Sequence, residues 1–256
     1  MPSSEEHSSS DSATISNPLP LTCLAVLSVN DSVAGTAAAG DPSPVWQVSW
    51  SPDGRILASC HGSPDPCVRV WKRRAAVEGL GGEAAAARPN RRHQPRQEQT
   101  WTLSATLRGA HTRTVRSVAI APVGTGTGGG SAAVIASASF DGTVAVWERF
   151  DEEDIAAGEE TQAAKEAGGY ECTAVLEGHE SEVKCVAWNG TGTLLATAGR
   201  DKSVWIWESF LPGTVGGGGG DGGGGEFECI AVLHGHSGDV KWVEFAPSNG
   251  QWGDGE

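Results

Sequence analysis

The sequence predicts an all-β fold built from one repeated unit of four short strands. The unit is clearest in residues 170–207, where four short apolar runs alternate with turn residues. Runs of this length that are rich in Val, Ile, Leu and Trp are typical of strands rather than helices. Similar units end at Trp71 and Trp147, and the beginning of another follows Phe227. We therefore expect three complete units and the start of a fourth.

The units share polar and aromatic residues at constant spacing. Each closing Trp comes six positions after an Asp, and in all units but the first a His precedes the second apolar run by four positions. Four strands in about forty residues, closed by Asp and Trp, resemble a blade of a WD-repeat β-propeller. The resemblance implies an incomplete propeller, with three blades plus the start of a fourth out of an expected seven.

The domain organisation follows from these repeats. We expect a disordered tail at 1–20, blades within 21–248 and a tail outside the fold at 249–256. The blades are predicted at about 21–71, 101–147, 170–207 and 227–248, with disordered insertions at 72–99, 124–131, 151–169 and 213–226. Such insertions fall where surface turns tolerate extra residues.

Two further strands are expected near the ends of the repeats. Leu21–Val29 reads as a first strand, and Val240–Phe245 reads as the first core strand of the fourth blade. No apolar run follows it in residues 249–256. Three and a half blades cannot close a ring, which would leave an open, aggregation-prone edge. We therefore expect a truncated product or an incomplete gene prediction.

Composition excludes several classes of function. The formal net charge of -14 argues against a general nucleic-acid binder, because phosphate binding needs an excess of Lys and Arg. A basic stretch between Arg69 and Arg116 leaves RNA binding as an alternative to a solvated loop. No apolar run is long enough to span a membrane, and the polar N-terminus is not a secretory signal. The expected location is the cytoplasm, with the nucleus as a further candidate.

The cysteine pattern predicts neither a metal nor another cofactor. The chain has six cysteines but no C-x-x-C pair and no zinc-finger spacing. Cys172, Cys185 and Cys229 look like small buried apolar residues. Cys60 and Cys67 could approach each other across a hairpin, which leaves a metal or redox role as a less favoured alternative.

Two sets of polar residues could be read as catalytic triads. A nucleophile that recurs in every repeat at one register is better explained as part of the fold, since buried polar groups must be paired. The WD-repeat resemblance implies a hydrogen-bond network of His111, Ser137, Asp141 and Trp147 in the second repeat, and of His179, Thr197, Asp201 and Trp207 in the third. In the first repeat Asp41 stands where the His would be, so we expect an incomplete network there. No enzyme activity is predicted.

Arg200 is the candidate partner-binding residue. It lies in the turn Gly-Arg-Asp-Lys, where the preceding repeats carry Phe140 and Pro64. Turn tips of this kind reach one rim of a propeller, and an exposed guanidinium suits a carboxylate partner.

The repeats also resemble a narrower family, the cytosolic iron–sulfur protein assembly WD-repeat proteins (Ciao/Cia). YECTAVLEGHESEVKCVAWNGTGTLLATAGRDKSVWIWE resembles the third repeat of that family, HTRTVRSVAIAP with ASASFDGTVAVWE the second, and FECIAVLHGHSGDVKWVEFAPS the start of the fourth. The resemblance implies that Arg200 belongs to a functional surface. Ala198 and Gly199 depart from the family, which usually has polar residues there.

The resemblance implies a non-catalytic scaffold of the targeting complex that delivers iron–sulfur clusters to cytosolic and nuclear apoproteins. It implies a small assembly partner, a HEAT-repeat adaptor and an iron-only-hydrogenase-like protein as partners, with no nucleic acid, no membrane and no cofactor of its own. The alternative is a WD-repeat adaptor in another complex, for example in RNA processing or ubiquitin ligation.

Overall fold

The computed structural model describes residues 43–74, 100–124, 133–149, 166–211 and 226–247. Within them the chain forms three four-stranded antiparallel sheets, so the all-β prediction is confirmed. Sheet 1 contains β1 (Val45–Trp50), β2 (Ile56–His61), β3 (Val68–Arg73) and β4 (Trp101–Leu107). Sheet 2 contains β5 (Val115–Gly124), β6 (Ala133–Ser139), β7 (Val144–Arg149) and β8 (Tyr170–Leu176). Sheet 3 contains β9 (Val183–Trp188), β10 (Leu194–Gly199), β11 (Val204–Phe210) and β12 (Glu226–Leu233).

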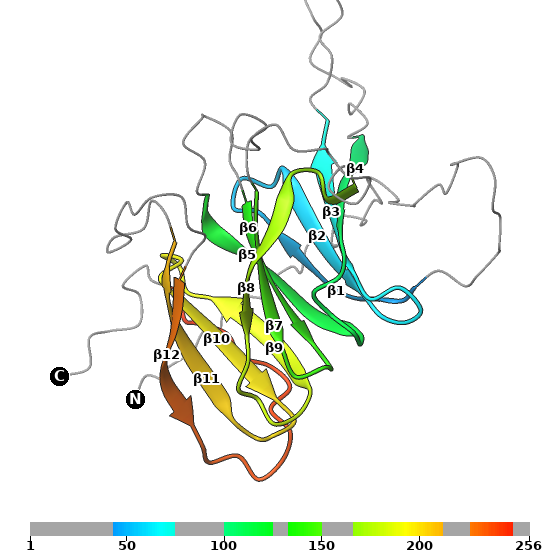
Figure 1. Cartoon of the computed structure of the whole chain (residues 1–256). Helices are drawn as coiled ribbons and strands as arrows, with labels where there is room; N and C mark the ends of the chain where they lie inside the picture. The colour runs from blue at the N-terminus through cyan, green and yellow to red at the C-terminus, as the bar shows by residue number, and fades with distance from the viewer. Residues whose placement is uncertain (1–42, 75–99, 125–132, 150–165, 212–225, 248–256) are drawn as a thin grey trace, which may run out of the picture.

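The sheets follow one another in chain order and pack face against face, with sheet 2 in the middle (Figure 1). Their first strands lie next to each other, and side chains on one first strand bind backbone groups of the next. The backbone N–H of Val118 donates to Gln47 Oε1 at 3.1 Å, and that of Val186 donates to Ser117 Oγ at 3.1 Å. These bonds satisfy N–H groups on strand edges that have no ladder partner.

Each sheet combines the last three strands of one sequence repeat with the first strand of the next repeat. The first strand of a repeat pairs with the last strand of the preceding repeat, as β4 does with β3, where Trp71 faces Leu103. The same arrangement joins β8 to β7 and β12 to β11. Neighbouring repeats are therefore linked by backbone hydrogen bonds as well as by packing.

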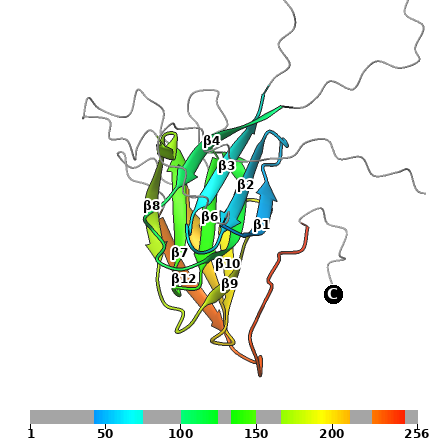
Figure 2. The same cartoon turned by 90° about the vertical axis from the view of Figure 1, so that its right-hand side faces the viewer.

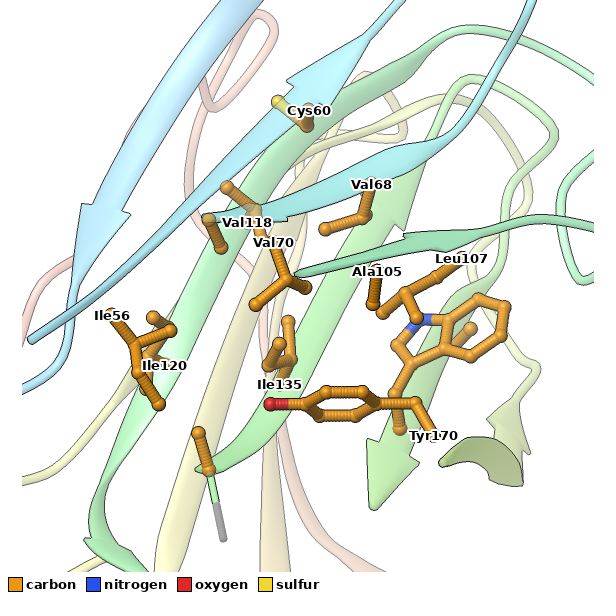
Figure 3. Packing of buried hydrophobic residues seen from close by; sticks show 14 of the residues in the cluster. Ile56, Cys60, Val68, Val70, Ala105, Leu107, Val118, Ile120, Ile135 and Tyr170 are labelled. Atoms are coloured by element: carbon orange, nitrogen blue, oxygen red, sulfur yellow. The ribbon is translucent and has the colours of Figure 1, made fainter. Parts of the chain in front are cut away.

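The apolar core lies between the sheets. Figure 3 shows the sheet 1–sheet 2 interface, where Val70 and Leu107 meet Val118 and Ile135. All four are at most 1% exposed. The second strands, β2 and β6, are buried on both faces, which explains their small Ala, Ser and Cys residues. A second cluster, which includes Leu195 of sheet 3, fills the interface between sheets 2 and 3.

The sheets do not close into a ring within the described residues. Equivalent leucines at the ends of the fourth strands show where the packing stops. Leu107 is 1% exposed and Leu176 is 8% exposed, but Leu233 in sheet 3 is 52% exposed. This agrees with the predicted incomplete propeller.

The predicted strand at Val240–Phe245 is not formed. After β12 the described chain contains no strand, and its last segment runs extended beside the sheets (Figure 2). Val240 still packs against Cys185 and Ala198, and its N–H donates to the carbonyl of Gly199 at 3.0 Å. The segment has the position of a first strand but, within the described residues, no neighbouring strand to form a ladder with.

Several expectations lie outside the described residues. They include the strand at Leu21–Val29, the position of Asp41, both tails and most of each insertion. The insertion expected at 72–99 begins later than predicted, because β3 includes Lys72 and Arg73. No helix in the described part of the chain is long and apolar enough to cross a membrane.

Candidate functional site

In sheet 2 the repeated polar residues come within hydrogen-bonding distance of one another. Ser137 Oγ lies 2.9 Å from His111 Nε2 and accepts a hydrogen bond from Trp147 Nε1, also at 2.9 Å. His111 Nδ1 lies 3.2 Å from Asp141 Oδ2. The Asp141 carboxylate also accepts hydrogen bonds from the backbone N–H and the hydroxyl of Thr143. The side chains therefore join the turn before β5 to β6, β7 and the β6–β7 turn.

Sheet 3 repeats this arrangement with Thr in place of Ser. His179 Nδ1 lies 2.6 Å from Asp201 Oδ2, and His179 Nε2 lies 2.8 Å from Thr197 Oγ1. Trp207 Nε1 donates to the same Thr197 oxygen at 3.1 Å. These residues match a catalytic triad in type and in the order of their contacts, but Ser137 and Thr197 are 0% exposed. Neither hydroxyl is presented to a substrate.

Sheet 1 contains an altered network, contrary to the incomplete one expected from the sequence. His61, at the end of β2, takes the role of the missing His. Its Nε2 lies 2.9 Å from Ser59 Oγ, which accepts from Trp71 Nε1 at 3.0 Å. In sheets 2 and 3 the His contacts the Asp directly, whereas here Arg69 lies between them. Its guanidinium is 3.3 Å from His61 Nδ1 and 3.4 Å from Asp65 Oδ2. A His two positions after the Ser on the same strand was the signal in the sequence.

The networks shift the pKa values of their acidic and basic members. Burial disfavours the charged form of Asp141 and Asp201, but hydrogen bonds outweigh it, so the pKa of each carboxyl is lowered. The donors are mainly His111 and Thr143 for Asp141, and Ser203 and His179 for Asp201. Burial lowers the pKa of His179, and the neighbouring Asp201 only partly opposes this. Burial, together with the charge of Arg69, also lowers the pKa of His61.

These shifts predict that stability falls as the pH falls from about 7.5 to 5. The unfolded histidines take up protons near their usual pKa of about 6.5, whereas folded His61 and His179 resist protonation. The unfolded state then binds more protons, so the free energy of unfolding decreases by up to about 1.4 kcal/mol per pH unit for each histidine. Below about pH 4 the carboxyls of Asp141 and Asp201 add to the loss.

Urea unfolding at several pH values measures this dependence. A His179→Gln variant should show a shallower slope between pH 7.5 and 5. The matched control is His236→Gln, which replaces an exposed His. A slope that is the same in His179→Gln as in the natural chain would contradict the prediction.

Arg200 lies in the β10–β11 turn and is part of an exposed charged cluster. Its Nη1 lies 3.2 Å from both carboxylate oxygens of Glu182, in the turn before β9. Arg113, in the corresponding turn before β5, places Nη2 3.3 Å from Glu182 Oε1. The hydroxyl of Ser181, the backbone N–H of Glu182 itself and the two guanidinium groups lower the pKa of the Glu182 carboxyl to about 2. Glu182 thus stays ionised between two arginines from adjacent sheets.

Aromatic rings extend this cluster toward sheet 1. The Arg113 guanidinium lies 6.0 Å from the centroid of the Phe140 ring, which meets Trp46 edge-on at 6.3 Å. Arg116 lies over Trp46 at 5.4 Å. We call this surface, formed by Trp46, Arg113, Arg116, Phe140, Glu182 and Arg200, the arginine rim. Its centre is a recess of about 310 Å³ lined by Arg113, Phe140, Glu182 and Arg200.

Gly199 allows the turn of Arg200 to approach Glu182. A Cβ atom at this position would lie 2.9 Å from the carbonyl oxygen of Glu182, which is too close. The Arg200 N–H donates to the same carbonyl at 2.9 Å. A larger residue at position 199 would therefore require the backbone of one of the two turns to shift.

Of the charged residues at this rim, Arg200 was predicted from the sequence, whereas Arg113 and Glu182 were not. The signal was available, because both occupy the turn before the second strand of consecutive repeats. Side chains of Arg113 and Arg200 are 56% and 59% exposed. Two exposed guanidinium groups that share one carboxylate can bind a further carboxylate from a partner.

The cysteines do not form a metal site among the described residues, which contain no cluster of three or more His, Cys, Asp or Glu suited to a metal. Burial raises the pKa of Cys60 and of Cys67 to about 12, so both remain thiols at neutral pH. Cys185 is buried as predicted, but the same prediction is wrong for Cys172 and Cys229, which are exposed. Both lie on the fourth strand of a sheet, where only one face is covered.

Comparison with known proteins identifies the repeats. The family model for the WD domain, G-beta repeat, matches residues 20–72, 101–148 and 170–208. These ranges make up more than half of the chain. The chain belongs to the WD-repeat family. Its three sheets are therefore WD-repeat blades.

Similar proteins carry names from iron–sulfur protein assembly. The chain is 34% identical over 184 residues to the probable cytosolic iron-sulfur protein assembly protein 1 of Mycosarcoma maydis, covering 66% of this chain and 36% of the relative. It is 40% identical over 141 residues to a probable cytosolic Fe-S cluster assembly factor of Schizosaccharomyces japonicus, covering 55% and 19%. It is 45% identical over 114 residues to the assembly protein 1 of Malassezia globosa, covering 44% and 28%. The chain thus spans well under half the length of these relatives, and the resemblance stated from the sequence is confirmed.

Proposed function

We propose that this WD-repeat chain acts as a non-catalytic scaffold in cytosolic iron–sulfur protein assembly. The observation that carries the proposal is that relatives from several organisms all carry names from cytosolic iron–sulfur assembly. A propeller blade supports binding through its rims and turns, where side chains of several repeats meet. The cytosolic location is part of the proposal.

Within this role, the arginine rim is the proposed docking surface. It places three arginines and one glutamate on a chain whose overall charge is -14. A local excess of guanidinium groups beside aromatic rings favours an acidic partner, since charge complementarity steers association. The proposed partners are assembly factors of the targeting complex: a small assembly partner, a HEAT-repeat adaptor and an iron-only-hydrogenase-like protein.

Arg200→Glu is expected to reduce the recovery of these partners at least about tenfold while leaving the fold intact. The variant reverses a charge at the rim and places a carboxylate beside Glu182. A substitution in an exposed turn changes stability by about 0.5 kcal/mol or less. Co-purification with the tagged chain, followed by mass spectrometry, measures partner recovery.

The matched control is Arg55→Glu. Arg55 lies in the β1–β2 turn, at the opposite end of the strands, and its side chain is 73% exposed. Arg55→Glu makes the same reversal of charge as Arg200→Glu but should leave the recovery of the partners unchanged. Equal recovery with Arg200→Glu and the natural chain would remove the rim from the binding surface. Recovery of only RNA-processing or ubiquitin-ligase components would replace iron–sulfur assembly with the other adaptor role.

A further inference from the structure

Three side chains that can donate hydrogen bonds occupy the same end of the interface between sheets 1 and 2. The first comes from β3. Val68 and Val70 point into the apolar cluster between the two sheets. Because side chains alternate along a strand, Lys72 lies on the same face and points toward sheet 2. It is half-buried, whereas its neighbour Arg73 is exposed on the other face.

The other two donors come from sheet 2. Ala145 and Trp147 of β7 point into the same cluster, so Arg149 follows them on the face toward sheet 1. Tyr170 of β8 stands directly opposite Arg149 in the ladder. Opposed side chains of this kind have Cβ atoms about 5 Å apart. Arg149 and Tyr170 are therefore neighbours on one face.

One polar atom of each residue in this pair lacks a hydrogen-bond partner. Arg149 Nε and the Tyr170 hydroxyl are both buried without a hydrogen-bond acceptor in the described structure. Tyr170 is 3% exposed, and Figure 3 shows its oxygen directed toward the end of the interface where Ile56 and Ile120 lie. Ile56 is the ladder partner of Lys72. The unpaired hydroxyl therefore points toward the end of the interface that holds Lys72.

The charge states of the three groups are consistent with donors rather than acceptors. Burial raises the pKa of Tyr170 to about 12, with Arg149 acting in the opposite direction, so the phenol keeps its proton. Burial and the charge of Arg149 lower the pKa of Lys72, in agreement with the position of both residues at this end of the interface. No ion pair joins Lys72 or Arg149 to an acidic side chain within the described ranges. Unpaired buried donors are unfavourable unless something accepts from them.

The equivalent end of the interface between sheets 2 and 3 is built differently. The position of Lys72 is taken by Glu148, which accepts a hydrogen bond from the Thr173 hydroxyl at 2.8 Å. The position of Arg149 is taken by Ser209, which donates to the carbonyl of Gly192 at 2.8 Å. Phe227 stands opposite Ser209 and has no hydroxyl. The fold does not require a cluster of donors at this position, so the one between sheets 1 and 2 is a specific feature.

We propose that Lys72, Arg149 and Tyr170 bind a small inorganic oxyanion of the size of phosphate at this end of the interface. The ammonium and guanidinium groups neutralise its charge, and the Arg149 Nε–H and the Tyr170 hydroxyl donate hydrogen bonds to its oxygens. The anion would hold sheets 1 and 2 together at a point where like charges otherwise face each other. The inference does not depend on the proposed function.

Titration of the full chain with inorganic phosphate tests the proposal. Calorimetry measures the affinity, and thermal unfolding compares phosphate with sodium chloride at equal ionic strength. Phosphate should raise the melting temperature of the natural chain more than chloride does. Arg149→Ser, which copies the equivalent residue of sheet 3, should weaken phosphate binding at least about tenfold, the usual result of losing one hydrogen bond to a charged group.

Two further variants complete the test. Arg73→Gln removes the same charge from the exposed face of β3 and should keep phosphate affinity within about twofold of the natural chain. If Arg149→Ser does not fold, Tyr170→Phe, which copies Phe227, should fold and bind phosphate more weakly. Absence of phosphate binding to the natural chain would overturn the proposal. So would an equal phosphate response in Arg73→Gln and in the site variants.

Discussion

Replacing Trp147 with Ala is expected to lower the free energy of unfolding by about 3–5 kcal/mol, the usual range for a buried Trp. Its ring is 4% exposed and packs in the cluster between sheets 1 and 2. Its Nε1 also donates to Ser137, whose oxygen lies beside His111. The substitution therefore leaves a cavity in the middle sheet, which supports both of its neighbours. Urea unfolding followed by far-ultraviolet circular dichroism measures the loss.

Trp147→Phe is the control that separates packing from hydrogen bonding. Phe keeps much of the ring's contact with the cluster but cannot donate to Ser137. Its loss of stability should be less than half of that caused by Ala. Equal losses in the two variants would mean that the hydrogen bond, rather than the packing, dominates at this position.

The strands and the spacing of the polar network were predictable because both follow from local patterns. Period-two alternation and turn residues located the strands. The constant distance from Asp to Trp placed Asp141 and Asp201 at one register, and in the structure each lies beside the His of its own repeat. Neither inference required knowledge of how the sheets pack.

Features that depend on packing between sheets were not predictable in this way. Cys172 and Cys229 read as buried because they lie in apolar strands, but those strands form the outer edge of their sheets, with one face uncovered. The segment at Val240 has a strand-like pattern but forms no ladder within the described residues, since a strand needs a neighbouring strand. Glu182 and Arg113 lie 69 positions apart, and only the adjacency of two sheets brings them together.

The role of His61 in the network of sheet 1 was only partly predictable from the sequence. The sequence contained the residue, but a His at the end of β2 points into the network only because β2 is buried on both faces. The same reasoning applies to the arginine rim. The turn of Arg200 was visible in the sequence, but the shared carboxylate was not.

Asp201→Ala should destabilise the chain by about 1–3 kcal/mol, the cost of leaving buried donors without an acceptor. The Asp201 side chain is 9% exposed and lies 2.6 Å from His179 Nδ1. It also accepts hydrogen bonds from the hydroxyl and N–H of Ser203 and from the N–H of Glu180. Truncation removes the acceptor of all these groups at once. Asp201→Asn, which retains one acceptor oxygen, should lose less.

A double-mutant cycle with His179→Ala decides whether these residues act as one network. The two residues are in contact, so the loss in the double variant should be smaller than the sum of the single losses by at least about 0.5 kcal/mol. Additive losses would mean that His179 and Asp201 stabilise the fold independently. A hydrolase activity that either single substitution abolished, with an unchanged melting temperature, would make them catalytic residues instead. The burial of Thr197 behind His179 argues for the coupled loss, because a hydroxyl with 0% exposure cannot reach a substrate while it holds β10 to β11 through Trp207.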